Sequence, residues 1–321
     1  MRANVLVAVA VTVLASACTI EEPSTSTTDQ DLSTWNRLAQ NRLAQNRLAQ
    51  NRLAQNRLAQ NSLNSTSVEA LHETARILET EGGRELYSYL INCALEEGTT
   101  VEATVPTATD TAPPSSLYTC TNQHCTFPGA LGLAPEWRWH KLSSKGQGWV
   151  SACIFSRVNA HTTTEAISLR GRHPQLTIGL DESELFPLSE GAFYGNLFVD
   201  EDQEIDWNAC RGEAQAASED GGLDLRDCTE PDPARPGYTQ CGFKFAGDCR
   251  DYTPAFPSPY ACRTFTGAPE SGYYGDCAGA KKSGHDDDDD DDGDCGHRHD
   301  GHGWHSNGHK YREVITVYVA N

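Results

Sequence analysis

The stretch "VITVYVA", residues 314–320, alternates two kinds of side chain along its length. Ile315 and Val317 fall on one face of an extended chain, while Thr316 and Tyr318 fall on the other. Side chains point to opposite faces in turn along a β-strand, and β-branched and aromatic residues favour strands. The stretch therefore predicts a strand of the main sheet, and this strand determines how the residues before it are interpreted.

An Asp- and His-rich segment, residues 284–310, precedes this strand. From His285 it contains "HDDDDDDDGDCGHRHDGHGWHSNGHK", with nine aspartates and six histidines. Because a core strand follows, we expect a loop inserted into the globular body and not a free tail. Structureless loops of this length are uncommon in compact domains and are usually functional or disordered.

The composition of this segment predicts that it binds divalent cations. Ca²⁺ prefers oxygen ligands, and "DDDDDG" at 288–293 matches the start of a calcium loop, although His299 stands where the bidentate Glu belongs. Imidazole groups instead suit Zn²⁺, Cu²⁺ or Ni²⁺. The candidate ligands are His285, Asp288, Asp290, Asp292, His297, His299, His302, His305 and His309.

Two other interpretations of the segment stay open. Protonation of its histidines as the pH falls through about 6.5 would cancel much of its negative charge and its repulsion from anionic surfaces. The richness in Asp and His is also only a signal of composition. A solvated loop that binds no metal physiologically would have the same composition.

The chain begins with residues typical of an export signal. Arg2 precedes an apolar run at 5–14, and the small residues Ala15, Ser16 and Ala17 lead to a cysteine. The run is too short to span a bilayer as a helix. Residues 1–17 therefore predict a secretory signal peptide.

The residues from Leu14 to Cys18 resemble the lipobox of bacterial lipoproteins, with the leucine one place further from the cysteine than usual. The resemblance implies that Cys18 is lipidated and becomes the first mature residue, followed by a flexible spacer at 18–35. Because Thr19 is not the aspartate that retains such proteins at the inner membrane, it also implies the outer membrane. Ordinary cleavage after Ala17, without a lipid, is the alternative.

The other eleven cysteines agree with export into an oxidising compartment. We expect ten of them to form five disulfides, and Cys295 to stay unpaired because it lies within the Asp/His segment. Short separations favour local bridges, and two predicted helices carry one cysteine each. The candidates are Cys120–Cys125, Cys241–Cys249, Cys262–Cys277 and Cys93–Cys153, with Cys210 and Cys228 left over.

A perfect repeat follows the spacer, with five copies of "NRLAQ" from Asn36 to Gln60. On an α-helix, a period of five gives no apolar stripe. On a β-strand, it places successive leucines on opposite faces. It resembles the pentapeptide-repeat family, which implies a square β-solenoid, but the copies make little more than one coil. A marginal helix or a structureless spacer are the alternatives. We expect a stalk at 36–64 whose arginines could touch an anionic membrane or polymer.

The globular body is predicted at 65–283 together with 311–321. We expect a first helix from Ser67 that ends at Gly82-Gly83, a second up to Gly98 and a third at 148–160. Short strands are expected at 99–105, 116–127, 164–169, 176–180 and 191–199, followed by strands within 236–249, 259–267 and 272–279. The predicted fold class is α+β: short N-terminal helices, then a disulfide-stapled, loop-rich, mainly antiparallel β body with one further helix.

No motif identifies a reaction. His72-Glu73 is followed by Arg76 where a zinc protease needs its second histidine. Acidic clusters at 181–184 and 200–204 are typical of solvated loops, and the aromatic and basic residues at 137–140 could pack or could line a groove. An exported hydrolase with an unrecognised site in the body stays as the alternative function.

The net charge of −20 argues against a nucleic-acid partner. The layout resembles cysteine-rich lipoproteins of myxobacterial type with N-R-L repeats, and this resemblance implies a surface location and no known activity. The hypothesis is a lipid-anchored envelope protein of binding or structural type with a cation-binding loop. Its partners would be the membrane, through the lipid, and an anionic envelope polymer; the sequence names no protein partner.

Overall fold

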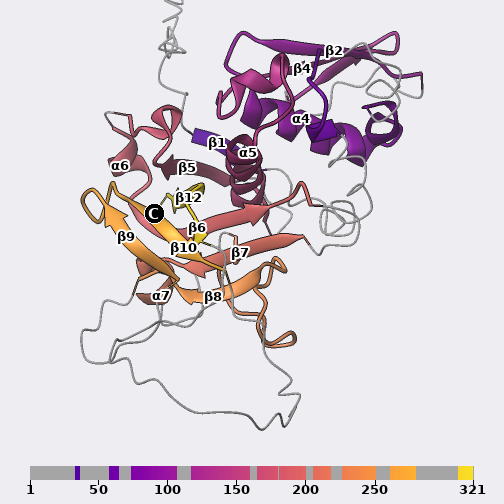
Figure 1. Cartoon of the computed structure of the whole chain (residues 1–321). Helices are drawn as coiled ribbons and strands as arrows, with labels where there is room; N and C mark the ends of the chain where they lie inside the picture. Colours follow the sequence, from indigo (N-terminus) through magenta and orange to yellow (C-terminus); the bar gives the residue numbers. More distant parts are fainter. Residues whose placement is uncertain are drawn as a thin grey trace, which may run out of the picture.

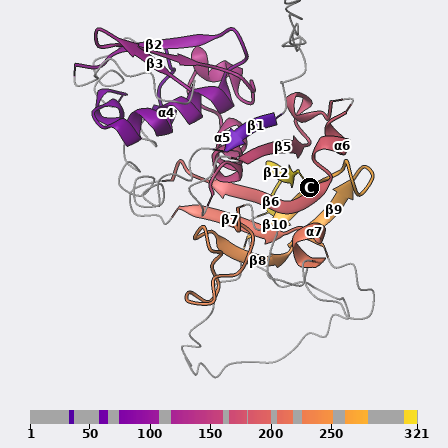
Figure 2. The ribbon, with the colours of Figure 1, turned by 180° about the vertical axis from the view of Figure 1, so that it is seen from behind.

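The computed structural model describes residues 33–36, 58–64, 74–106, 117–159, 165–179, 181–199, 205–217, 226–250, 261–279 and 310–320. Over these ranges the chain has the predicted α+β fold, with three mostly antiparallel sheets, helices and several disulfides. Figures 1 and 2 show one large sheet, with a smaller unit of helix and hairpin at its upper end.

The largest sheet has six strands, and the predicted strand of residues 314–320 lies in its middle. The strand order is β1 (Ser33–Asn36), β5 (Glu165–Gly171), β12 (Val314–Val319), β6 (Leu188–Asn196), β7 (Asp206–Arg211) and β8 (Lys244–Asp248). Neighbours pair antiparallel except β7 and β8, which are parallel. The last strand in the sequence thus joins two strands that lie far earlier in the chain.

Both faces of β12 are buried. Ile315, Val317 and Val319 belong to the main hydrophobic core, which also contains apolar residues of helix α5 (Ser144–Ser156). On the other face, the hydroxyl of Thr316 accepts a 2.8 Å hydrogen bond from the backbone N–H of Tyr274. Thr316 and Tyr318 therefore face a second layer of protein and not solvent.

That second layer is a small sheet with the order β11 (Lys310–Tyr311), β10 (Tyr273–Ala278) and β9 (Cys262–Thr266), all antiparallel. It contacts the main sheet beside β12, and Figure 1 shows β9 and β10 crossing the large sheet at this point. The predicted strands within 259–267 and 272–279 are confirmed as β9 and β10. β8 confirms the strand predicted within 236–249.

Helix α5 confirms the helix predicted at 148–160, but it begins four residues earlier, at Ser144. The hydroxyl of Ser143 accepts a hydrogen bond from the backbone N–H of Gly146, at 3.1 Å, and so caps the first turn. Val150 and Ile154 are fully buried, in agreement with their helical spacing.

Helix α4 (Glu81–Ala94) contradicts the prediction that Gly82-Gly83 ends a helix. Residues 74–78 are helical, the chain breaks at Thr80, and both glycines lie in the first turn of α4. The Thr80 hydroxyl caps this turn by accepting from the N–H of Gly83, at 3.0 Å. A Cβ on Gly83 would collide with the carbonyl oxygen of Ile77, so glycine is needed here for close approach and not for a break.

The third sheet has the order β2 (Thr100–Thr104), β4 (His124–Pro128) and β3 (Thr119–Thr121). The predicted single run at 116–127 is in fact a hairpin, with its turn at Asn122 and Gln123, both in left-handed conformation. The strand predicted at 176–180 is wrong. A short 3₁₀ helix, η3 (Pro174–Leu176), ends at the first residue of that range, and residues 177–179 form no strand. Pro174 begins η3 because it cannot donate to a ladder, and the His173 side chain accepts from the N–H of Gln175.

The N-terminal part differs most from prediction. Ser33–Asn36 forms β1, which pairs with β5 at the edge of the main sheet, although 18–35 was predicted to be a flexible spacer. Leu58 and Ala59 are buried in the main core, although 36–64 was predicted to be a stalk. The segment carrying most of the NRLAQ repeat therefore connects two parts of the body. Residues 37–57 themselves, like the signal peptide and the helix start at Ser67, lie outside the described residues.

The other named short elements are η2 (Pro135–Arg138), which precedes α5; α6 (Glu182–Leu185), which precedes β6; and α7 (Glu213–Ala217), which follows β7. The strands predicted at 99–105, 164–169 and 191–199 are confirmed as β2, β5 and β6, within a few residues at each end. No helix in the described ranges is long and apolar enough to cross a membrane.

Candidate functional site

The cysteines of the described ranges form five disulfides, which are typical of a protein from an oxidising, extracytoplasmic compartment. The bonded pairs are Cys93–Cys153, Cys120–Cys125, Cys210–Cys249, Cys228–Cys241 and Cys262–Cys277. The predicted bridges Cys120–Cys125, Cys262–Cys277 and Cys93–Cys153 are confirmed, the last joining α4 to α5.

The predicted bridge Cys241–Cys249 is wrong, because an extended strand separates the two residues. β8, Lys244–Asp248, covers about 16 Å at the usual rise of a strand. A disulfide needs its two Cα atoms within about 7 Å. The backbone N–H of Cys249 donates to the carbonyl of Arg211 at 2.8 Å, and this contact places Cys249 beside Cys210 instead.

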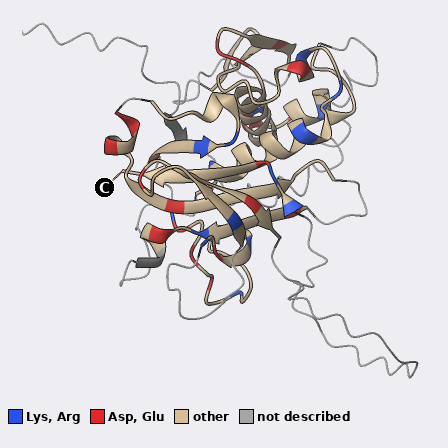
Figure 3. Cartoon of the chain, turned by 60° about the vertical axis from the view of Figure 1, so that its left-hand side comes forward, with Lys and Arg blue, Asp and Glu red and all other residues tan. Residues whose placement is uncertain are grey.

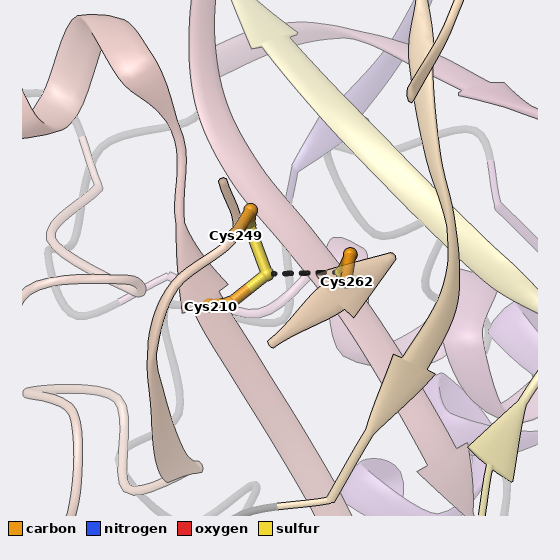
Figure 4. Close-up of side chains that lie close together, drawn as sticks. All are labelled: Cys210, Cys249 and Cys262. Atoms are coloured by element: carbon orange, nitrogen blue, oxygen red, sulfur yellow. Dashed lines mark hydrogen bonds between the residues drawn. A yellow bond between two sulfur atoms is a disulfide. The ribbon is translucent and has the colours of Figure 1, made fainter. Parts of the chain in front are cut away.

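Two of the disulfides lie against each other. The Sγ atoms of Cys210 and Cys262 are 3.7 Å apart, and each atom is bonded to a different partner. The sulfurs of Cys210, Cys249 and Cys262 all lie within 4.8 Å of one another, and all three residues are buried. Figure 4 shows these three side chains converging between the main sheet and β9. If they were reduced to thiolates, three buried sulfurs at this spacing could hold a metal ion.

The cluster lies in the second, smaller hydrophobic core, between the main sheet and the β9–β10 hairpin. Its neighbours there include Ala192, Tyr194, Ala261, Tyr274 and Val314. Burial raises the pKa of the Tyr194 hydroxyl above its usual range, and this hydroxyl donates to the carbonyl of Ala278 at 2.8 Å. The sulfurs therefore lie in a dry and largely apolar environment.

The described chain stops at residue 279, before the Asp/His segment, and resumes at residue 310, and both points lie close to this cluster. Cys277 pairs with Tyr311 and Ala278 pairs with Lys310 in the antiparallel β10–β11 ladder. The ring of Tyr311 packs on Tyr194, with centroids 5.4 Å apart. The residues that flank the segment are thus held together by a ladder fixed to the core, while the segment up to residue 309 lies outside the described residues.

The predicted ligands themselves lie outside the described residues. These are His285, Asp288, Asp290, Asp292, His297, His299, His302, His305 and His309. Cys18 and Cys295 also lie outside them. In the view of Figure 3, acidic and basic residues are interspersed along the helices and strands that the structure describes.

The acidic cluster at 181–184 does not form a carboxylate pair suited to hydrolysis. Glu182 is buried and accepts hydrogen bonds from the hydroxyl of Ser168 and from the N–H of Gly179. The hydroxyl of Ser168 in turn accepts from Nε of Arg170 at 2.9 Å. The guanidinium of Arg170 lies 3.6 Å from the ring centroid of Tyr318. This network joins β5, β12 and α6, so its role is structural.

The aromatic and basic residues at 137–140 divide between core and surface. Trp137 is fully buried, and its indole N–H donates to the carbonyl of Asn61 at 3.1 Å. Trp139 is 62% exposed, with the guanidinium of Arg138 4.9 Å from its ring centroid. Because the first tryptophan packs and only the second faces solvent, the pair does not line a shared groove.

A comparison with protein-family models, with curated proteins and with solved structures finds no match to this chain. Its function must therefore be inferred from its own chemistry. Sequence reasoning missed the convergence of Cys210, Cys249 and Cys262, because their spacing follows no known ligand motif. The sequence did contain one signal. Each of these cysteines lies in or next to a stretch with strand character, and strands of one domain can pack together and bring their cysteines close.

Proposed function

We propose that the protein is an exported, lipid-anchored envelope protein that binds divalent cations through the Asp/His segment at 285–309. The observation that supports this most is the β10–β11 ladder, in which Ala278 is paired with Lys310. The ladder presents the segment from a disulfide-bonded core and keeps its two ends together.

The closed ends lower the entropic cost of binding. A free tail with these ligands would have to close a loop whenever distant residues shared one ion, and loop closure costs free energy. Here the ladder already closes the outer loop. The remaining cost is the closure of the shorter loops between ligands and the ordering of the residues that contact the ion. Histidines two to four residues apart would share Zn²⁺, Cu²⁺ or Ni²⁺, and the aspartates would favour Ca²⁺.

The proposed anchor would hold the body close to the membrane. β1 begins at Ser33, so residues 19–32 alone would link a lipidated Cys18 to the main sheet. Fully extended, they span about 50 Å. A cation held by the segment could then bridge the protein to an anionic envelope polymer, which fits a binding or structural role at the outer membrane.

The metal-binding part is tested by calorimetry on the oxidised protein with Zn²⁺, Cu²⁺, Ni²⁺ and Ca²⁺. The matched variant keeps the segment length but replaces its six histidines by asparagine, and a second variant does the same for its nine aspartates. We expect the histidine variant to lose the transition-metal heat and the aspartate variant to lose the Ca²⁺ heat. Equal heats in the wild type and both variants would refute the proposed site.

The anchor is tested separately by metabolic labelling with a fatty-acid analogue in a bacterial host. We expect label on the wild type and none on Cys18→Ala. Label that persists in Cys18→Ala would show that the lipid, if present, is attached elsewhere.

A further inference from the structure

Two disulfides contact each other at the base of the β9–β10 hairpin. Four strands or their ends contribute one cysteine each: Cys210 on β7, Cys249 after β8, Cys262 on β9 and Cys277 on β10. We propose that reduction of these two disulfides creates a buried thiolate site for a thiophilic metal ion such as Zn²⁺.

The spacing of the sulfurs fits such an ion. In a tetrahedral site with Zn–S bonds of about 2.3 Å, neighbouring sulfurs lie about 3.8 Å apart. The two Sγ atoms that belong to different disulfides, those of Cys210 and Cys262, are already 3.7 Å apart. The Sγ of Cys249 is within 4.8 Å of both. Reduction only has to let each bonded pair separate to the same distance.

Backbone hydrogen bonds hold the cysteines in place independently of the S–S bonds. The N–H of Cys249 donates to Arg211 at 2.8 Å, and the N–H of Cys262 donates to the carbonyl of Cys249 at 3.1 Å. Cys262 and Cys277 are direct partners in the β9–β10 ladder. The side chains of Cys210, Cys249 and Cys262 therefore stay close together when the disulfides open, with Cys277 held beside Cys262, and this preorganisation favours metal binding.

The arrangement disfavours attack by Cys262 on the Cys210–Cys249 bond. Exchange requires the attacking sulfur to approach along the line of the bond that it breaks. The Sγ of Cys262 lies within 4.8 Å of both sulfurs of the Cys210–Cys249 bond, so the three atoms form a triangle and not a line. A triangle of sulfurs is the shape that a single ion can contact from one side.

The chemistry requires a reductant, for which we name a protein dithiol. Each disulfide takes two electrons and two protons from one dithiol, which itself becomes a disulfide. Zn²⁺ then displaces one proton from every thiol that it binds, because the thiolate is the ligand. Thiolates select soft and borderline ions such as Zn²⁺ and Cu⁺ over Ca²⁺ or Mg²⁺.

The site is tested with Co²⁺ as a spectroscopic probe on the chain carrying Cys18→Ser and Cys295→Ser. With these changes, every thiol comes from the five disulfides. After reduction by a phosphine, we expect one thiolate-bound Co²⁺ per chain, counted by the thiolate charge-transfer absorption and the visible bands of tetrahedral cobalt. The Asp/His segment offers only nitrogen and oxygen ligands in this variant, so it cannot produce the thiolate band.

Two variants with the same number of cysteines removed give the comparison. Serine at 210, 249, 262 and 277 should abolish the thiolate band, whereas serine at 93, 120, 125 and 153 should leave it unchanged. Equal bands in both variants, or no band in the parent, would overturn the proposal. Binding that the Asp/His segment alone provides would survive in all of these proteins, so the two proposals fail separately.

A second measurement uses only the chain with Cys18→Ser and Cys295→Ser. It therefore does not depend on whether the two variants with four further serines fold. Alkylation of the reduced protein is followed by peptide mass spectrometry with and without Zn²⁺. We expect alkylation of Cys210, Cys249 and Cys262 to slow by about tenfold or more when Zn²⁺ is bound, because a metal-bound thiolate is a poor nucleophile. Cys120 and Cys125 should react at an unchanged rate. Equal slowing at all these positions, or none, would also overturn the proposal.

Discussion

Arg226 and Glu190 form an ion pair inside the protein, with Nη1 and the carboxylate Oε2 3.1 Å apart. Their side chains are 1% and 2% exposed. The arginine has a further role, because its Nη2 donates to the carbonyl oxygens of Ser156 at 2.6 Å and Val158 at 2.7 Å. These carbonyls lie at the C-terminal end of α5, where free acceptors and the helix dipole favour a cation. Arg226 therefore fixes the end of α5, and Glu190 balances its charge.

The first prediction concerns Glu190→Gln. Burial raises the pKa of Glu190, and the nearby Arg226 only partly opposes this. The folded state thus binds this proton more tightly than the unfolded state, so ionisation of Glu190 costs stability. We expect the wild type to lose stability relative to Glu190→Gln as the pH rises from about 4.3, the ordinary value for glutamic acid, through the raised pKa of Glu190. Urea unfolding of both proteins from pH 4 to pH 8 measures the difference.

The comparison with glutamine isolates this carboxyl, because all other titrating groups are common to both proteins. Arg226→Leu is the companion variant, and it should destabilise at every pH because it also removes the bonds to the end of α5. If the wild type instead became more stable relative to Glu190→Gln as the pH rises, Arg226 would hold the pKa of Glu190 below its ordinary value.

At the scale of single elements, the local patterns of the sequence predicted those elements whose own side chains follow a regular pattern. β12 follows from alternation, α5 from the spacing of Val150 and Ile154, and the β3–β4 region from residues of strand character. The errors arise where a tertiary contact decides. Gly82-Gly83 resembles a helix break until the carbonyl of Ile77 is seen to pack against it.

The candidate site shows the same limit. The bridge Cys262–Cys277 could be predicted because both residues lie in one hairpin, where strand pairing is local. The bridge Cys210–Cys249 depends on the parallel pairing of β7 with β8, and pairing between separate strands leaves no periodic signal in the sequence. The contact between the two disulfides depends further on how the small sheet packs on the large one, which no local pattern encodes.

The second prediction compares two disulfides. Cys93–Cys153 joins α4 to α5 across a sequence separation of 60, and Cys120–Cys125 closes a hairpin across a separation of 5. In the chain-entropy model, a bridge stabilises by restricting the unfolded chain, and more so for a longer loop. We expect Cys93→Ala with Cys153→Ala to cost about 4 kcal/mol, and Cys120→Ala with Cys125→Ala about 2 kcal/mol. Urea unfolding of the two double variants provides the measurement.

Both variants remove two sulfurs, so each serves as the control for the other. The larger loss should come from the helix pair, whose cysteines are also fully buried. An equal or smaller loss at Cys93 and Cys153 would show that the unfolded chain retains contacts between the segments of α4 and α5, which would reduce the entropy that the bridge removes.

At the scale of the whole molecule, the course of the N-terminal segment changes the role of the NRLAQ repeat. β1 lies at the edge of the main sheet, while Leu58 and Ala59 belong to its core. The carbonyl of Ala59 also accepts from the N–H of Leu142, at 2.9 Å, and fixes the point where the chain re-enters the body. The repeat is thus attached to the body at both ends. It cannot act as a stalk that sets the distance between body and anchor.

The third prediction follows from this attachment, and it rests on the proposed lipid at Cys18. Deleting two repeat units, residues 41–50, shortens only a connection within the body. We expect the free energy of unfolding to change by about 0.6 kcal/mol or less, because loop closure depends weakly on length. The height of the lipidated body above a supported bilayer, measured by neutron reflectometry, should also stay the same. Deleting residues 21–30, which is an equally long change between anchor and β1, should bring the body closer to the bilayer. If instead the repeat deletion lowered the body and the spacer deletion did not, the repeat would be the stalk, and the pairing of β1 with β5 would not persist at the membrane.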